Sequence, residues 1–178
     1  MSAPQTPATV LSSVGGSDAR TLRNLLGQFA TGVTVITTRA ADGRRVGMTA
    51  NSFSSVSLEP PLVLWSLSRN APSLPDFVAA GHFAIHVLER GQHGLSNRFA
   101  RPADDKFAGL DHGEGPAGIP LLEGAVATLV CRNSRQYDGG DHLIFIGEIE
   151  QFGQGGGEPL LFHAGRYRIA VAHPDLED

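Results

Sequence analysis

The sequence has little of what would tie a protein to a disulfide framework, a membrane or nucleic acid. Cys131 is the only cysteine, which excludes an internal disulfide and is typical of a reducing cytoplasm. No apolar run reaches the roughly 18–20 residues of a membrane-spanning helix, and no basic-then-apolar signal pattern opens the chain. The net charge is −4 and the longest basic run is Arg44-Arg45, which argues against nucleic acid and anionic membranes as partners. We therefore expect a cytoplasmic protein.

The motifs of several common enzyme classes are also missing. The glycines at 153–157 come closest to a Rossmann fingerprint, but they lack its last glycine and a following helix. No G-x-S-x-G, H-E-x-x-H or Walker sequence is present. His82 and His86 would lie about 13 Å apart on a strand, so we expect no metal site. Cys131 lies in an apolar strand pattern, where an inert buried thiol is the favoured interpretation.

The chain is long enough for one domain with a hydrophobic core. Its 178 residues are 41% hydrophobic and 18% charged, which is typical of a globular protein. We find no internal repeat and no second domain boundary. The prediction is a flexible N-terminal tail at 1–20, one domain at 21–172 and a C-terminal tail at 173–178.

Strand patterns dominate this domain. One helix is predicted from Leu22, Leu25, Leu26 and Phe29, which recur at helical spacing, with Asp18 as its cap and Gly32 as its stop. Two short helices are predicted after Ser73 and at 92–100. The predicted strands are 33–38, 46–56, 61–67, 83–88, 125–132, 142–152 and 160–167, with a hairpin turn at Asp42-Gly43. Hairpins without regular βαβ alternation predict a mainly β, antiparallel barrel with peripheral helices.

The segment 47–67 is the most informative part of the sequence. Its first half carries Thr49-Ala50-Asn51-Ser52, where a strand that only packs would prefer Val, Ile or aromatic residues. Small side chains and hydroxyls allow a ligand to approach the backbone and hydrogen-bond there. A polar, solvent-facing strand of an ordinary barrel is an equally good interpretation of these residues alone.

A second unusual cluster is Tyr137-Asp138-Gly139-Gly140-Asp141-His142. It predicts a tight turn with His142 as the first residue of the apolar strand that follows. This places an imidazole at a barrel rim, where it either points into a cleft or faces water.

Taken together, these motifs resemble the short-chain flavin reductases. The resemblance runs from about Leu22 to Tyr167, with the motifs in the family's order and spacing. The residues that carry it are 32–38, 47–53, 59–64, Phe99-Ala100, 105–109 and Gly140-Asp141-His142.

This resemblance implies an antiparallel split β-barrel, assembled as a homodimer, with the flavin in a groove near the subunit interface. Such enzymes use NADH or NADPH to reduce FMN or FAD and pass the reduced flavin to a separate monooxygenase. No basic pair is evidently placed for a 2′-phosphate, which favours NADH. Two alternatives are a flavin-binding electron carrier with permanently bound FMN and a cofactor-free scaffold.

The resemblance also implies the site residues. Met48, Thr49, Ala50, Asn51 and Ser52 would line the isoalloxazine. The ribityl and phosphate end of the flavin would lie near Ser66, Leu67, Ser68 and Ser73. Hydroxyl groups and the start of a helix favour an anion there. Lys106, near Phe99, would contact a phosphate or adenylate. The nicotinamide nucleotide would meet His142, the expected catalytic residue, and Tyr167.

Two further expectations follow from that assignment. Hydride transfer is the cofactors' own chemistry, so His142 would orient the nicotinamide carboxamide rather than act as a nucleophile. Trp65 departs from the small or aliphatic residues common at its position, and it would narrow the groove on that side.

Overall fold

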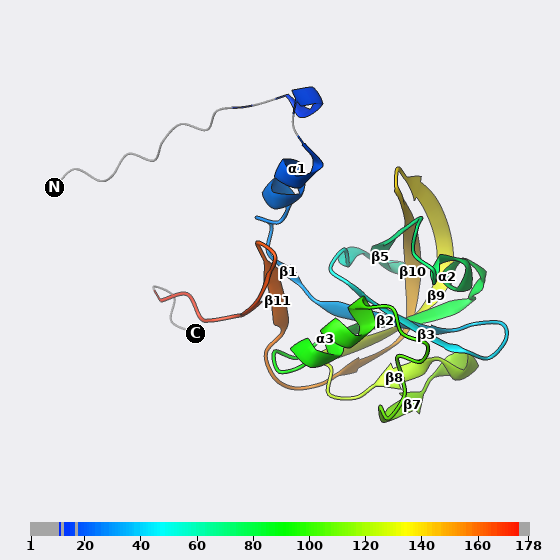
Figure 1. Ribbon diagram of the computed structural model, residues 1–178. Coiled ribbons are helices and arrows are strands. Elements are labelled where there is room, and N and C mark those ends of the chain that lie inside the picture. Colours follow the sequence, from blue (N-terminus) through cyan, green and yellow to red (C-terminus); the bar gives the residue numbers. More distant parts are fainter. Residues whose placement is uncertain (1–10, 12, 17, 175–178) are drawn as a thin grey trace.

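The computed structural model describes residues 11, 13–16 and 18–174, and within them β-strands predominate as predicted. Figure 1 shows a curved sheet with short helices on its outside. The helices are α1 (Ala19–Leu26), α2 (Leu74–Ala79) and α3 (His93–Ala100), with 3-10 turns η1 (Val14–Gly16) and η2 (Pro116–Gly118). The strands are β1 (Thr31–Gly32), β2 (Thr34–Arg39), β3 (Arg45–Ala50), β4 (Ser54–Leu58), β5 (Pro61–Ser68), β6 (His82–Val87), β7 (His112–Glu114), β8 (Pro120–Leu122), β9 (Ala127–Gly139), β10 (His142–Gln154), β11 (Leu160–His163) and β12 (Arg166–Ile169).

Seven strands form the main sheet, in the order β3-β2-β6-β9-β10-β5-β4, and every pairing is antiparallel. A side chain connects β5 with the bend that follows β3. The Ser52 hydroxyl accepts from the Ser66 amide at 2.9 Å and donates to the Ser66 carbonyl at 3.1 Å. One hydroxyl therefore supplies a strand-like pair of hydrogen bonds where no strand ladder joins β3 to β5.

Four predicted elements have wrong boundaries. The predicted strand 125–132 is β9, which begins at Ala127 and continues to Gly139. The predicted strand 46–56 is two strands, because the chain bends at residues 51–53. The predicted strand 160–167 is the β11–β12 hairpin, whose turn holds Ala164 and Gly165 at positive φ. The first helix ends at Leu26 with Gly27 as its C-cap, and Gly32 lies in β1 instead.

Trp65 lies in the main core rather than beside a groove, so the expectation that it narrows the groove is wrong. Its side chain is fully buried and stacks on Phe145, with ring centroids 4.4 Å apart. Phe77 of α2 and Phe83 of β6 contact it edge to face. This aromatic cluster holds α2 against the sheet.

Gly47 determines how closely α3 approaches β3. A Cβ atom built on Gly47 would lie 2.5 Å from Cε1 of the buried Phe99 and 3.2 Å from Cζ of the buried Phe107. Any larger residue would therefore have to displace one of these rings. The glycine lets α3 lie across β3, as Figure 1 shows.

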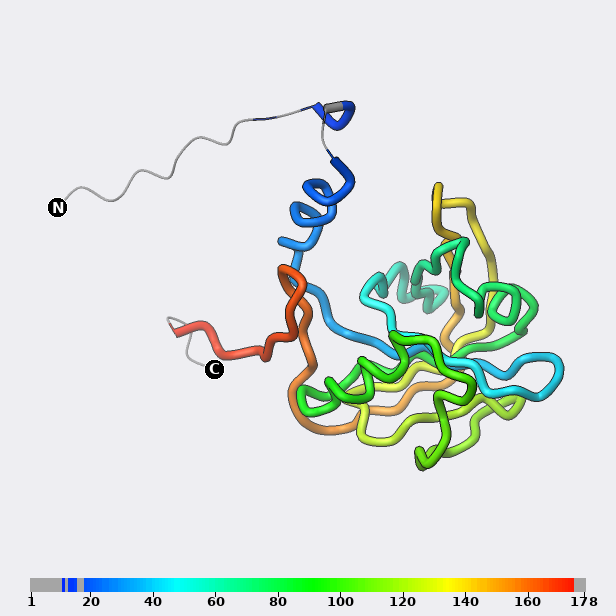
Figure 2. The backbone as a smooth tube through the Cα atoms, viewed as in Figure 1, coloured from blue at the N-terminus to red at the C-terminus, as the bar shows by residue number. Residues whose placement is uncertain are grey.

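Helix α1 stands apart from the barrel. Asp18 caps it by accepting from the Thr21 amide at 2.6 Å, as predicted. Within the described part of the chain its apolar face is uncovered, because Leu25, Leu26 and the following Phe29 are 67%, 66% and 79% exposed. Figure 2 shows α1 beside the β11–β12 hairpin, where Ala164 donates to the Gly27 carbonyl.

The predicted tails fall mainly outside the described residues. Positions 1–10, 12, 17 and 175–178 are not described, and α1 already begins at Ala19, inside the predicted tail 1–20. Among the helices in the described part of the chain, none is long and apolar enough to cross a membrane.

Candidate functional site

A cavity of about 450 Å³ opens between β3, the end of β5, the start of α2 and the segment after α3. This volume lies within the range of small-molecule binding sites. The lining residues are Arg44, Arg45, Val46, Gly47, Met48, Thr49, Leu67, Ser68, Ala71, Pro72, Ser73, Asp76, Phe99, Ala100, Arg101, Pro102, Ala103, Asp104 and Lys106.

The structure gathers seven of the predicted site residues around this cavity. They are Met48, Thr49, Leu67, Ser68, Ser73, Phe99 and Lys106. The others lie outside the lining: Ala50, Asn51, Ser52, Ser66, His142 and Tyr167. The role of each of these residues in binding stays a prediction.

Two hydroxyls of the predicted flavin strand already have protein partners. Thr49 Oγ1 donates to the Ser96 carbonyl of α3 at 2.6 Å, and the Ser52 hydroxyl is held by both backbone groups of Ser66. Thr49 keeps lone pairs that can accept a hydrogen bond, because only its proton is used. The hydroxyls therefore fix the cavity wall as much as they offer contacts to a ligand.

Lys106 ties the two sides of the cavity together. Its Nζ donates to the Phe99 carbonyl at 2.8 Å and to the Gly47 carbonyl at 3.2 Å. Burial lowers the pKa of this ammonium below its usual range. An ammonium has three N–H donors, so one remains for a ligand.

Three cationic residues of the cavity, Arg44, Arg45 and Arg101, are not among the predicted site residues. The pair Arg44-Arg45 precedes the predicted flavin strand directly, which was the available signal. Arg44 makes ion pairs with Asp42 at 2.7 Å and with Asp76 at 3.1 Å. With Lys106, these residues place four cations against the carboxylates of Asp76 and Asp104 in the lining.

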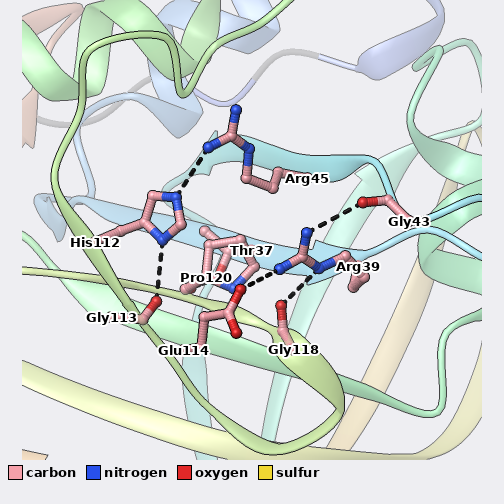
Figure 3. Close-up of polar contacts among 9 residues, drawn as sticks. All are labelled: Thr37, Arg39, Gly43, Arg45, His112, Gly113, Glu114, Gly118 and Pro120. Atoms are coloured by element: carbon pink, nitrogen blue, oxygen red, sulfur yellow. Dashed lines mark hydrogen bonds and ion pairs between the residues drawn. The ribbon is translucent and has the colours of Figure 1, made fainter.

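Arg45 is held from outside the cavity by the β7–β8 region (Figure 3). Its guanidinium lies 2.9 Å from Asp105 and donates to His112 Nε2 at 3.1 Å. Arginine has no acceptor, so Nε2 is unprotonated and His112 Nδ1 donates to the Gly113 carbonyl.

The β7–β8 region is itself fastened to β2. Arg39 pairs with Glu114 and donates to the Gly118 carbonyl, both at 2.7 Å, while the Thr37 hydroxyl donates to the Pro120 carbonyl (Figure 3). These contacts fix the platform that orients Arg45.

His142 lies where the sequence predicts, as the first residue of β10 at the tip of the β9–β10 hairpin. Its backbone register pairs it with Ser68, which lines the cavity. His142 Nδ1 lies 2.7 Å from a carboxylate oxygen of Asp141. The hydrogen bond to His142 lowers the pKa of Asp141 below its usual range. The imidazole is half-exposed, one strand position away from the cavity lining.

Tyr167 lies in a second hollow of about 300 Å³, lined also by Arg90, His93, Leu160, Arg168 and Ile169. Its hydroxyl donates to Asn97 Oδ1 at 3.1 Å and lies 2.9 Å from Ser96 Oγ. Because the phenol proton is used on Asn97, Ser96 acts as the donor to Tyr167. Both hydrogen bonds are made to α3, so Tyr167 contacts the helix that also carries Phe99 and anchors Thr49.

Comparison with known proteins identifies the family of the chain. The family model described as "Flavin reductase like domain" matches residues 26–170. The chain is 45% identical to the FMN reductase (NADH) SmoA of Agrobacterium fabrum, over 86% of this chain and 87% of that protein. It spans only 48% of the reductase component of the trigonelline monooxygenase of Acinetobacter baylyi, at 44% identity.

Solved structures agree in fold. The NADH:FAD oxidoreductase SgcE6 of Streptomyces globisporus, in complex with NAD and FAD fragments, superimposes with a TM-score of 0.85 at 41% identity, covering 95% of this chain and all of that one. The flavin reductase PheA2 gives a TM-score of 0.79 at 38% identity, covering 88% of this chain and all of that one. The predicted split-barrel fold is thereby confirmed.

Proposed function

The chain belongs to the flavin reductase-like family, and we propose that it uses NADH to reduce free FMN or FAD and releases the reduced flavin to a separate monooxygenase. The observation that supports this proposal most is that the residues matched by the family model include Gly47–Thr49 of β3, which form part of the cavity wall. The cavity residues fit a flavin nucleotide: Gly47 lets Phe99 pack onto β3, Met48 and Phe99 are apolar, and four cationic side chains line the cavity.

The nicotinamide and flavin rings supply the hydride chemistry when bound. The protein's own residues bind and orient. Backbone groups of Met48 and Thr49 and the hydroxyls of Ser68 and Ser73 offer polar contacts along the cavity. His142, held by Asp141, orients the nicotinamide carboxamide, since placement within ~1 Å governs such a transfer.

We propose a cytoplasmic location as part of this function. The single cysteine, Cys131, is a buried free thiol, and burial together with Glu150 raises its pKa to about 12. One cysteine forms no internal disulfide, and proteins without disulfides are typical of a reducing compartment.

The first prediction concerns the activity itself. Purified protein should oxidise NADH only when free flavin is added, because the flavin exchanges as a substrate. The measurement is steady-state oxidation of NADH and NADPH with FMN, FAD and riboflavin in one panel. Background rates in every combination would refute the reductase assignment, and tightly retained FMN without NADH oxidation would favour the electron carrier.

The second prediction is a homodimer that covers α1. The exposed leucines at 25 and 26 and Phe29 form an apolar face that a second copy would bury symmetrically. Light scattering at micromolar concentration should give about twice the 18.8 kDa of one chain. Leu25→Glu with Leu26→Glu should reduce this mass to that of one chain, whereas Asn24→Glu on the same helix should not. A fully active parent with the mass of one chain would contradict the dimer.

A further inference from the structure

Three of the four cationic side chains that line the cavity already make hydrogen bonds or ion pairs within the protein. Arg44 pairs with two carboxylates, Asp42 and Asp76. Arg45 pairs with Asp105 and donates to His112. Lys106 spends two of its three N–H groups on backbone carbonyls. To bind an anion, Arg44 or Arg45 would have to break or share an existing ion pair.

Arg101 differs from these three. It is the C-cap residue of α3, in an extended conformation that ends the helix, and its side chain is exposed at the cavity. Among the described residues, no hydrogen bond or ion pair holds its guanidinium. All five N–H donors of its planar fork are therefore available, and this fork matches the oxygens of a phosphate bidentately.

The cavity also contains a second uncommitted donor. Ser73 precedes α2, but its hydroxyl makes no capping hydrogen bond to that helix. Its side chain lines the same cavity as Arg101. An exposed cation and a free hydroxyl on one cavity provide a charged and a neutral donor for one anion.

We propose that Arg101 binds the phosphate of the flavin nucleotide and makes the protein prefer FMN and FAD over riboflavin. This inference rests on the proposed function, because it takes the flavin as the occupant of the cavity. The pyrophosphate of NADH offers the same chemistry, so the experiment has to separate the two sources.

The test compares flavin affinities by fluorescence quenching, without NADH. Arg101→Gln should weaken FMN binding about 10- to 100-fold, the range expected for a lost charge-assisted contact. Riboflavin affinity should stay at the parent value, since riboflavin has no phosphate. Arg101→Lys should recover part of the loss, because it keeps the charge without the fork.

Two comparison variants sharpen the result. Arg44→Gln should cost less FMN affinity than Arg101→Gln, because Arg44 is already paired. Arg135→Gln removes the same charge from β9, outside the lining of both hollows, and should leave FMN affinity unchanged. Thermal unfolding of each variant checks that the fold is intact.

Several outcomes would overturn the inference. Equal losses for FMN and riboflavin would indicate a change in cavity shape, and no loss for either would remove Arg101 from the site. An unchanged FMN affinity with a raised KM for NADH, measured with riboflavin as acceptor, would assign Arg101 to the NADH pyrophosphate. A failure of the proposed function is distinguishable, because the parent would then oxidise no NADH whatever its flavin affinity.

Discussion

Replacing His142 with alanine is expected to lower the rate of hydride transfer about a hundredfold while leaving flavin affinity close to that of the parent. The side chain sits at the tip of the β9–β10 hairpin, in register with Ser68 at the cavity lining. Its Nδ1 lies at hydrogen-bond distance from the Asp141 carboxylate, which constrains the orientation of the ring. A misplacement of ~1 Å in the reacting pair can cost about this factor.

The measurement is single-turnover hydride transfer at saturating flavin, beside flavin affinity by fluorescence quenching. Tyr137→Phe is a matched control, since Tyr137 lies on the same hairpin and is half-exposed outside the cavity lining. If flavin affinity collapsed while hydride transfer at saturating flavin stayed normal, His142 would belong to the flavin site instead.

Local patterns predicted the elements whose signals are local. The Asp42-Gly43 turn forms, with Gly43 at positive φ, because only glycine adopts that conformation freely. His142 begins β10 after a turn whose Gly140 also has positive φ. The alternation of side chains between the two faces of β5 would have predicted correctly that Trp65 is buried, since Val63, Trp65 and Leu67 share the buried face.

The missed features depend on contacts between distant segments. Arg101 and Arg44 meet at one cavity only because α3 lies on β3, and that approach depends on Phe99 filling the space above Gly47. The Ser52 hydroxyl bonds to Ser66 for a similar reason, since the bend after β3 turns it toward β5. Neither arrangement leaves a periodic signal in the sequence.

The buried histidine His86 is expected to make the stability of the protein depend strongly on pH. His86 is fully buried in β6, where its imidazole bridges two other strands. The Leu122 amide donates to Nε2 at 3.1 Å, so Nε2 is unprotonated and Nδ1 donates to the Val35 carbonyl at 3.1 Å. Burial lowers the pKa of His86 to about 4, partly opposed by the Val35 hydrogen bond.

The sign of the pH dependence follows from this lowered pKa. Between about pH 6.5, where an unfolded histidine titrates, and about pH 4, the unfolded chain binds a proton that the folded chain does not. The contribution of His86 to the free energy of unfolding is therefore complete above about pH 6.5 and declines as the pH falls toward 4. The full loss is roughly 3 kcal/mol, a large part of a typical domain stability.

Urea denaturation from pH 4 to pH 8 measures this loss of stability. The His86→Gln variant separates the contribution of His86 from that of the carboxylates, which also titrate in this range. Glutamine does not titrate, so the variant should be less stable than the parent at pH 7 but should lose less stability between pH 6.5 and 4. The difference between the two curves isolates His86, because the surface carboxylates are common to both proteins. A constant difference across this range would mean that His86 titrates alike in the folded and unfolded chains, contrary to its buried bridge between Val35 and Leu122.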